Sequence, residues 1–156
     1  MPQAWRLVHH KYVHSAFSGE GARLAGGRWN SEGNAVVYTA GSLSLALLEI
    51  IVHLEFKEAL KLYKAIPVEI PEALLQSIDP SKLLDGWSAS PPQSSTQFIG
   101  NCWAEGLASA ALKVPSAIIP NEFNYLLNPA HPGFERIKRG APIDLPVDPR
   151  VFDKLG

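Results

Sequence analysis

The most hydrophobic stretch of the chain, residues 43–54, predicts an amphipathic helix. Its leucines and isoleucines recur three and four positions apart, which places side chains on one helical face. Ser42 stands directly before this run and is a suitable N-cap, because its hydroxyl can accept a hydrogen bond from a free backbone N–H. A second helix is predicted over residues 96–112, with Thr96 or a neighbouring serine as its cap.

Short segments of β-branched, aromatic or alternating apolar residues predict strands between and beside these helices. The strand segments lie in residues 4–9, 34–40, 59–71, 114–120, 121–127 and 141–145. Helices and strands alternate without a regular βαβ rhythm, which argues against a doubly wound fold. The predicted fold class is therefore α+β, with a single domain over residues 1–156 and a mixed β-sheet flanked by helices.

Two segments are predicted to be loops. Residues 9–34 are rich in glycine and polar groups, with room for a turn of helix, and residues 85–95 are rich in proline and serine. Loops of the first length are uncommon in compact domains unless they carry function or move. The first loop contains Gly-Gly-Arg-Trp-Asn at residues 26–30, which makes it the first place to look for a site.

Composition and charge narrow the class of protein. The net charge is −1 and no long basic run occurs, so binding to nucleic acid is not expected. The longest apolar run is too short to span a bilayer, and no signal peptide is visible. Cys102 is the single cysteine, which excludes an internal disulfide and favours a cytoplasmic setting. Its helical context favours a small core residue over a nucleophile.

The glycine-rich loop fails the standard tests for a phosphate-binding motif. A dinucleotide fingerprint that begins at Gly19 meets Leu24 where its third glycine belongs, and a P-loop meets Gly27 and Arg28 where Lys-Ser/Thr belongs. Glycine still lets the backbone approach a ligand, and arginine suits bidentate phosphate contacts. Two interpretations stay open: a phosphate contact by Arg28, or a plain glycine turn with Arg28 on the surface and Trp29 in the core.

Glu49 lies inside the most hydrophobic helix, where a carboxylate is costly unless it is paired, solvated or used. It could be exposed and paired with a base, or it could line a cleft with its charge directed at a ligand. His53 follows at helical spacing, but nothing in the sequence supplies a third metal ligand. No metal site is therefore predicted.

Together these segments resemble the RES domain, the toxin of bacterial toxin–antitoxin pairs. The resemblance covers residues 5 to 145 and places the arginine, glutamate and serine of the family name on Arg28, Glu49 and Ser116. Tyr38 matches the family's active-site tyrosine. Asn124 and Asn128, in Phe-Asn-Tyr-Leu-Leu-Asn-Pro, belong to a motif typical of the family.

The resemblance implies an ADP-ribosyltransferase-like fold with NAD⁺ as substrate and no metal. It also implies an antitoxin partner with an Xre-type helix-turn-helix, which covers the active-site cleft. Members consume NAD⁺ by hydrolysis or phosphorolysis, and some modify a protein by ADP-ribosylation. A non-enzymatic module that binds a partner helix is the remaining alternative.

Each motif residue then has an expected role. Glu49 contacts a ribose hydroxyl and stabilises the developing cation. Arg28 holds a phosphate, which Gly27 lets come close, and Tyr38 packs against nicotinamide. Ser116 hydrogen-bonds the ligand or, alternatively, caps backbone between two prolines. Asn128 is expected among the NAD⁺ contacts.

Overall fold

Strands from the whole length of the chain form one eight-stranded sheet in the computed structural model, which describes residues 1–156. The strand order is β4-β5-β6-β2-β1-β3-β7, and β8 also pairs with β3. Only β4 and β5 run parallel, so the sheet is mixed, as predicted. The strands are β1 (Gln3–His9), β2 (Val37–Ala40), β3 (Tyr63–Glu69), β4 (Leu75–Ser77), β5 (Ala111–Pro115), β6 (Phe123–Leu127), β7 (Lys138–Arg139) and β8 (Ile143–Asp144).

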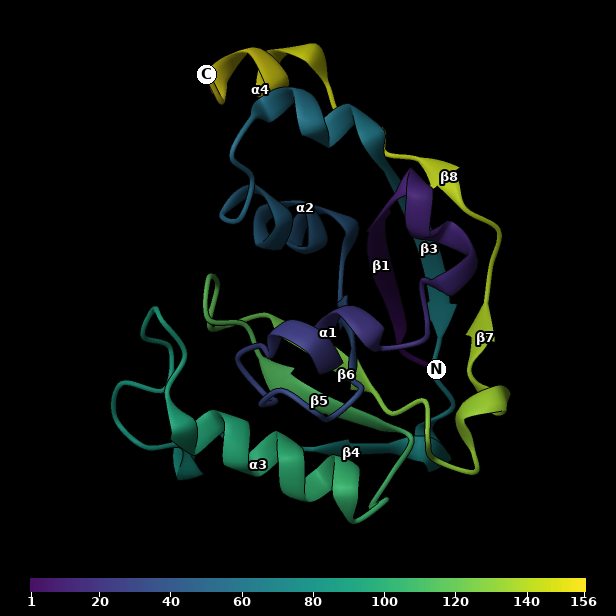
Figure 1. Ribbon diagram of the computed structural model, residues 1–156, viewed down its shortest axis with the longest axis vertical. Coiled ribbons are helices and arrows are strands. Elements are labelled where there is room, and N and C mark those ends of the chain that lie inside the picture. Colours follow the sequence, from purple (N-terminus) through teal and green to yellow (C-terminus); the bar gives the residue numbers. More distant parts are fainter.

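Four α-helices and five short 3₁₀ helices surround this sheet (Figure 1). The helices are α1 (Glu20–Ala25), α2 (Leu43–Ile51), α3 (Ser94–Glu105), α4 (Pro149–Lys154), η1 (His10–Ser15), η2 (Lys57–Leu62), η3 (Glu72–Leu74), η4 (Pro80–Lys82) and η5 (Phe134–Arg136). None of them is long and apolar enough to cross a membrane. The single α+β domain with a mixed sheet is therefore the architecture that the sequence predicted.

The sheet is strongly curled where β1 meets β2. These strands pair only at Trp5 and Ala40, whereas β1 and β3 pair along the whole length of β1. Figure 1 shows the result: β4, β5 and β6 run across the lower half beside α3, and the antiparallel strands β1 and β3 run vertically near α2. The strands therefore part next to Tyr38, and the residues of the candidate site lie around this point.

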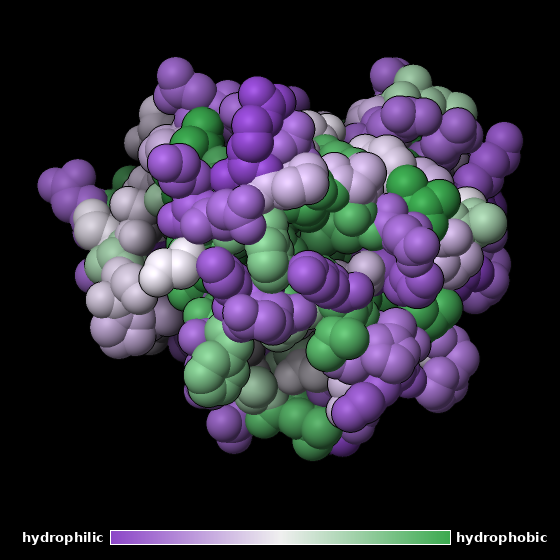
Figure 2. All heavy atoms as spheres, turned by 90° about the horizontal axis from the view of Figure 1, so that it is seen from above, coloured by the Kyte–Doolittle hydropathy of each residue, from purple (hydrophilic) through white to green (hydrophobic).

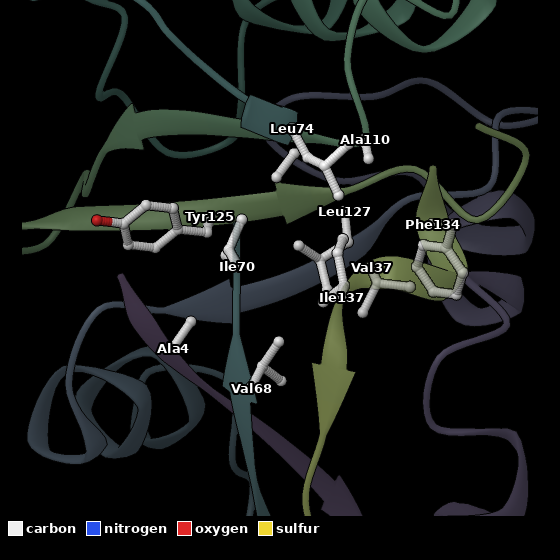
Figure 3. Packing of buried hydrophobic residues seen from close by; sticks show 11 residues of the cluster. Ala4, Val37, Val68, Ile70, Leu74, Ala110, Tyr125, Leu127, Phe134 and Ile137 are labelled. Atoms are coloured by element: carbon white, nitrogen blue, oxygen red, sulfur yellow. The ribbon is translucent and has the colours of Figure 1, made fainter. Parts of the chain in front are cut away.

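Buried apolar side chains join the two halves. Figure 3 shows the largest cluster, to which β1, β2, β3, β6 and the segment around η5 all contribute. A second cluster lies between α3 and the sheet and contains Trp29 and Trp103. Trp29 is only 2% exposed, which confirms the expectation that it belongs to the core.

Local sequence rules predicted one helix start correctly and one wrongly. Ser42 caps α2, since its Oγ accepts a hydrogen bond from the Leu45 N–H at 3.1 Å. Thr96, in contrast, lies inside α3, which begins at Ser94 with Gln93 in the cap position. The Thr96 hydroxyl donates to the carbonyl oxygen of Arg28 at 2.6 Å instead, so a tertiary contact uses it.

Three further expectations need correction. The helix expected over residues 43–54 ends at Ile51. The strand expected over residues 114–120 lies at Ala111–Pro115, and a turn follows it. Cys102 is exposed on α3, because this position faces away from the sheet, and so it is not a core residue.

The end of the molecule that carries α4 has a mixed surface. Figure 2 shows hydrophobic groups there, interspersed with hydrophilic ones. Large apolar side chains are exposed on and after α2. Leu48 on the helix is 39% exposed, and Val52 and Phe56, which follow the helix, are 58% and 70% exposed. The outer side of the helix that carries Glu49 is therefore partly apolar and is not covered by the rest of the chain.

Candidate active site

Glu49 is at the centre of a hydrogen-bonded cluster formed by α2, β6 and the turn after β5. Its Oε1 accepts a hydrogen bond from Ser116 Oγ at 2.8 Å and another from Asn124 Nδ2 at 2.9 Å. Its Oε2 has no partner within the protein, and His53 is exposed beyond the end of the helix. The carboxylate is therefore oriented by one oxygen and free at the other.

Ser116 is fully buried directly after β5. Its Oγ accepts hydrogen bonds from the backbone N–H groups of Ile118 and Ile119, both at 3.1 Å. A hydroxyl has a single proton to donate, and here that proton goes to Glu49. Ser116 thus satisfies the turn, as one alternative expected, and also holds the Glu49 carboxylate.

Arg28 follows Gly27 in the glycine-rich loop, and its guanidinium is partly committed. Nη1 donates to the carbonyl oxygens of Trp87 at 3.0 Å and Ala89 at 2.8 Å, whereas Nε and Nη2 have no protein partner. Burial lowers the pKa of Arg28, and the Glu49 carboxylate partly offsets this. An arginine remains charged despite such shifts. The site therefore contains a cation whose charge interacts with that of Glu49 and whose Nε and Nη2 donors are free.

Tyr38 on β2 fixes the loop through its hydroxyl. The hydroxyl donates to Asn30 Oδ1 at 2.6 Å and accepts from the Trp29 N–H at 3.1 Å. Burial raises the pKa of Tyr38, so the phenol stays neutral at ordinary pH. A Cβ on Gly27 would lie 2.6 Å from this hydroxyl oxygen, which makes the glycine necessary for the approach of Tyr38.

Asn30 is a site residue that sequence reasoning missed. It is fully buried, and its Nδ2 donates to the carbonyl oxygens of Ala22, Ser31 and Asn34 at 2.9 to 3.1 Å. These bonds tie the Gly-Gly-Arg-Trp-Asn turn to α1. The only signal in the sequence was an asparagine at the end of a glycine turn, where its amide commonly bonds nearby backbone.

Arg6 on β1 is a second residue that was missed. Its Nε donates to the Ala16 carbonyl oxygen at 3.0 Å and its Nη1 to that of Tyr38 at 3.4 Å, where β1 and β2 part. Burial lowers the pKa of Arg6, and Tyr63 partly offsets this. No carboxylate forms an ion pair with it. An arginine inside an apolar strand was the available signal.

Asn128 does not join the cluster. It is 1% exposed, its Nδ2 donates to the Ala104 carbonyl oxygen and its Oδ1 accepts from the Ala130 N–H, both at 3.0 Å. This geometry gives the Asn128 amide a structural role apart from the Glu49 cluster, and a contact with NAD⁺ stays a prediction. Nowhere do three His, Cys, Asp or Glu side chains gather as a metal site would need.

Known proteins are similar in sequence to this chain over nearly its whole length. A protein named "Toxin Res" from Photorhabdus laumondii is 41% identical, over 94% of this chain and 95% of its own. Another "Toxin Res", from Yersinia enterocolitica, is 36% identical over 94% and 97%. The "Prs ADP-ribosylating toxin" of a Sphingobium species is 39% identical over 96% of each chain.

The fold is also known from a solved structure. A chain in the crystal structure of the M. tuberculosis MbcT-MbcA toxin-antitoxin complex superposes with a TM-score of 0.77. The match covers 98% of this chain and 87% of the other, at 19% sequence identity. The family description "RES domain" matches residues 3–148. This coverage and the relatives confirm the resemblance seen in the motifs: the chain belongs to the RES domain family.

Proposed function

We propose that this protein is the toxin of a toxin–antitoxin pair and depletes NAD⁺ by cleaving the bond between nicotinamide and ribose. The observation that carries the proposal is the Glu49 carboxylate, held through Oε1 with Oε2 free, beside the cationic Arg28. The names of the relatives from Photorhabdus and Yersinia support the role of a toxin.

The chemistry of NAD⁺ explains why one carboxylate suffices. Nicotinamide leaves as a neutral molecule from a pyridinium, so the leaving group needs no proton, unlike that of an ordinary glycoside. The transition state develops positive charge on the ribose, which a fixed negative group stabilises. Glu49 would accept a hydrogen bond from a ribose hydroxyl through Oε2 and stabilise this charge.

The remaining groups would orient the substrate. Arg28 offers Nε and Nη2 to the pyrophosphate while Nη1 stays on the 87–89 loop. Arg6 lies where the strands part, and its unpaired charge suits the same diphosphate. Tyr38 would pack its ring against nicotinamide, because its hydroxyl is already bonded within the protein.

Glu49→Gln tests the mechanism. The variant keeps the size of the side chain but removes its charge, so nicotinamide release should fall by roughly 100-fold or more. Binding of NAD⁺ and the unfolding midpoint should change little. Glu55→Gln is the matched control, since Glu55 is exposed and makes no hydrogen bond. Nicotinamide release that is equal in Glu49→Gln and wild type would refute the mechanism.

The acceptor of the ADP-ribosyl group is a separate question. Water or phosphate would give free ADP-ribose or ADP-ribose-1″-phosphate, and a protein acceptor would be modified. The name of the Sphingobium relative, an ADP-ribosylating toxin at 39% identity, favours protein modification as the second candidate function. NAD⁺ labelled in its adenylate and incubated with and without phosphate, and with cell lysate, separates the three products.

The same proposal includes a cytoplasmic location and an antitoxin of the Xre type with a helix-turn-helix. The similar solved chain was crystallised in a toxin–antitoxin complex, which supports a protein partner. Coexpression with such a protein should restore growth and should block nicotinamide release in vitro. Release that continues at full rate in the purified complex would contradict a partner that covers the cleft.

A further inference from the structure

Asn124 is the second group that holds Glu49, and no role has been assigned to it above. Its Nδ2 donates to Glu49 Oε1 at 2.9 Å, next to the bond from Ser116 Oγ at 2.8 Å. Because both bonds end on the same oxygen, they fix the rotation of the carboxylate and leave Oε2 free. A single donor would leave that rotation less restricted.

The position of Asn124 is set by the middle of the sheet. It lies on β6, opposite Ala40 of β2 on one side and Val114 of β5 on the other. A residue that is paired on both sides cannot shift without distorting two ladders. Side chains on such rigid elements hold a reacting group more accurately than side chains on loops.

The other end of the same amide is not satisfied. Asn124 Oδ1 is buried and has no hydrogen-bond partner. A buried acceptor without a partner costs free energy, and an apolar side chain of similar shape would avoid that cost. Turning the amide over would place Oδ1 against the Glu49 carboxylate, where two acceptors repel. Stability of the fold therefore does not account for an asparagine at this position.

The place of Glu49 in its helix adds a reason for two donors. Glu49 lies in the last turn of α2, which ends at Ile51. The C-terminal end of a helix has a partial negative charge, which disfavours a carboxylate there. Donors from outside the helix offset this repulsion, and Ser116 and Asn124 are the two that reach the carboxylate.

We propose that Asn124 is a positioning residue for the reaction of Glu49. Its Nδ2 keeps Oε2 directed toward the substrate, and the unpaired Oδ1 is the cost of that orientation. The inference rests on the proposed cleavage of NAD⁺ and predicts that function and stability respond in opposite directions when Asn124 is replaced.

Asn124→Leu tests this directly, because leucine is similar in shape and makes no hydrogen bond. We expect kcat for nicotinamide release to fall roughly 10- to 100-fold, since small misplacements of a reacting group have effects of this size. KM for NAD⁺ should stay within about twofold, because the substrate contacts remain. The unfolding midpoint should equal or exceed that of wild type. Asn121→Leu, the same change at an exposed position in the turn before β6, should leave all three unchanged.

Three results would overturn the proposal. An unchanged kcat would show that Ser116 alone positions Glu49. A large rise in KM with little loss of kcat would mean that Asn124 contacts NAD⁺ itself. A lower midpoint in Asn124→Leu and also in the smaller Asn124→Ala, or failure of both to fold, would assign Asn124 to the fold.

A double-mutant cycle separates this inference from the proposed function. If wild type releases no nicotinamide, the cleavage mechanism fails, whereas the contact is still tested by unfolding of Asn124→Leu, Glu49→Ala and the double variant. The contact predicts non-additive changes in their unfolding free energies. Additive changes would exclude it, whatever the activity of the protein.

Discussion

Gly27→Ala should destabilise this protein although the change adds one methyl group. The backbone of Gly27 is not in the left-handed region, so alanine fits its conformation. The new Cβ, however, would lie 2.6 Å from the Tyr38 hydroxyl oxygen and 3.1 Å from Asn30 Oδ1. Real Cβ atoms essentially never approach another atom as closely as the first of these distances. The side chain of Tyr38 must therefore move.

The cost follows from what Tyr38 would lose. Its hydroxyl makes the 2.6 Å bond to Asn30 and the 3.1 Å bond from the Trp29 N–H, and each is worth about 1 kcal/mol net. Asn30 Oδ1 would remain buried without a donor, which costs about 1–3 kcal/mol. Partial relaxation reduces the sum, and we expect about 2–4 kcal/mol in the free energy of unfolding.

Urea unfolding followed by circular dichroism measures this change. Gly21→Ala is the control, because nothing lies within 4 Å of a Cβ on Gly21, and it should be neutral or slightly stabilising. In a Tyr38→Phe background the closest contact and both bonds are absent. The cost of Gly27→Ala should therefore be at least about 1 kcal/mol smaller there than in wild type. Equal costs in the two backgrounds would refute the idea that Gly27 exists to accommodate Tyr38.

Two further outcomes follow from Arg28 and Tyr38. Arg28→Lys cannot keep the geometry of one Nη1 that bonds both Trp87 and Ala89. Amide exchange in residues 86–90 should therefore become roughly tenfold faster or more. The exposed control Arg23→Lys should leave this exchange unchanged, and equal exchange in all three proteins would contradict the idea that Arg28 holds the 87–89 loop. Burial raises the pKa of Tyr38 above its ordinary value of 10.0. As pH rises, the tyrosine therefore loses its proton in the unfolded protein before it does so in the folded protein. The free energy of unfolding then falls as pH rises above about 10. Wild type should therefore lose more unfolding free energy than Tyr38→Phe between pH 9 and pH 11, and parallel curves would be the contrary result.

Local pattern was sufficient for Glu49 and its helix but not for its partners. The apolar spacing and Ser42 predicted α2, and a carboxylate in that run stood out for its cost. Ser116 and Asn124 lie 67 and 75 positions away along the chain. Their contact depends on how β5, β6 and α2 are placed in space, which periodicity within one segment does not contain.

The wrong helix cap at Thr96 and the separation of Asn128 from Glu49 have the same origin. Thr96 looks like a cap, but Arg28 O, which is 68 positions away, takes its proton. Asn128 shares a motif with Asn124, yet the two point to different parts of the fold: one to the backbone of Ala104, the other to Glu49. A motif groups residues by sequence, whereas Asn124 lies within β6 and Asn128 lies just after the strand ends, so their side chains reach different partners.

The two interpretations of the Gly-Gly-Arg-Trp-Asn turn are compatible, because they concern different atoms. Trp29 is in the core and the Arg28 carbonyl oxygen and Nη1 are bonded to α3 and the 87–89 loop, as a structural turn requires. Nε and Nη2 of Arg28 have no protein partner, as a phosphate contact requires, and the charge of Arg28 interacts with that of Glu49. Arginine spreads its donors over three nitrogens in a fixed plane and can serve both directions at once, whereas lysine has a single nitrogen. The structural contacts therefore hold the guanidinium in one place before a ligand arrives, which lowers the entropy that binding would cost.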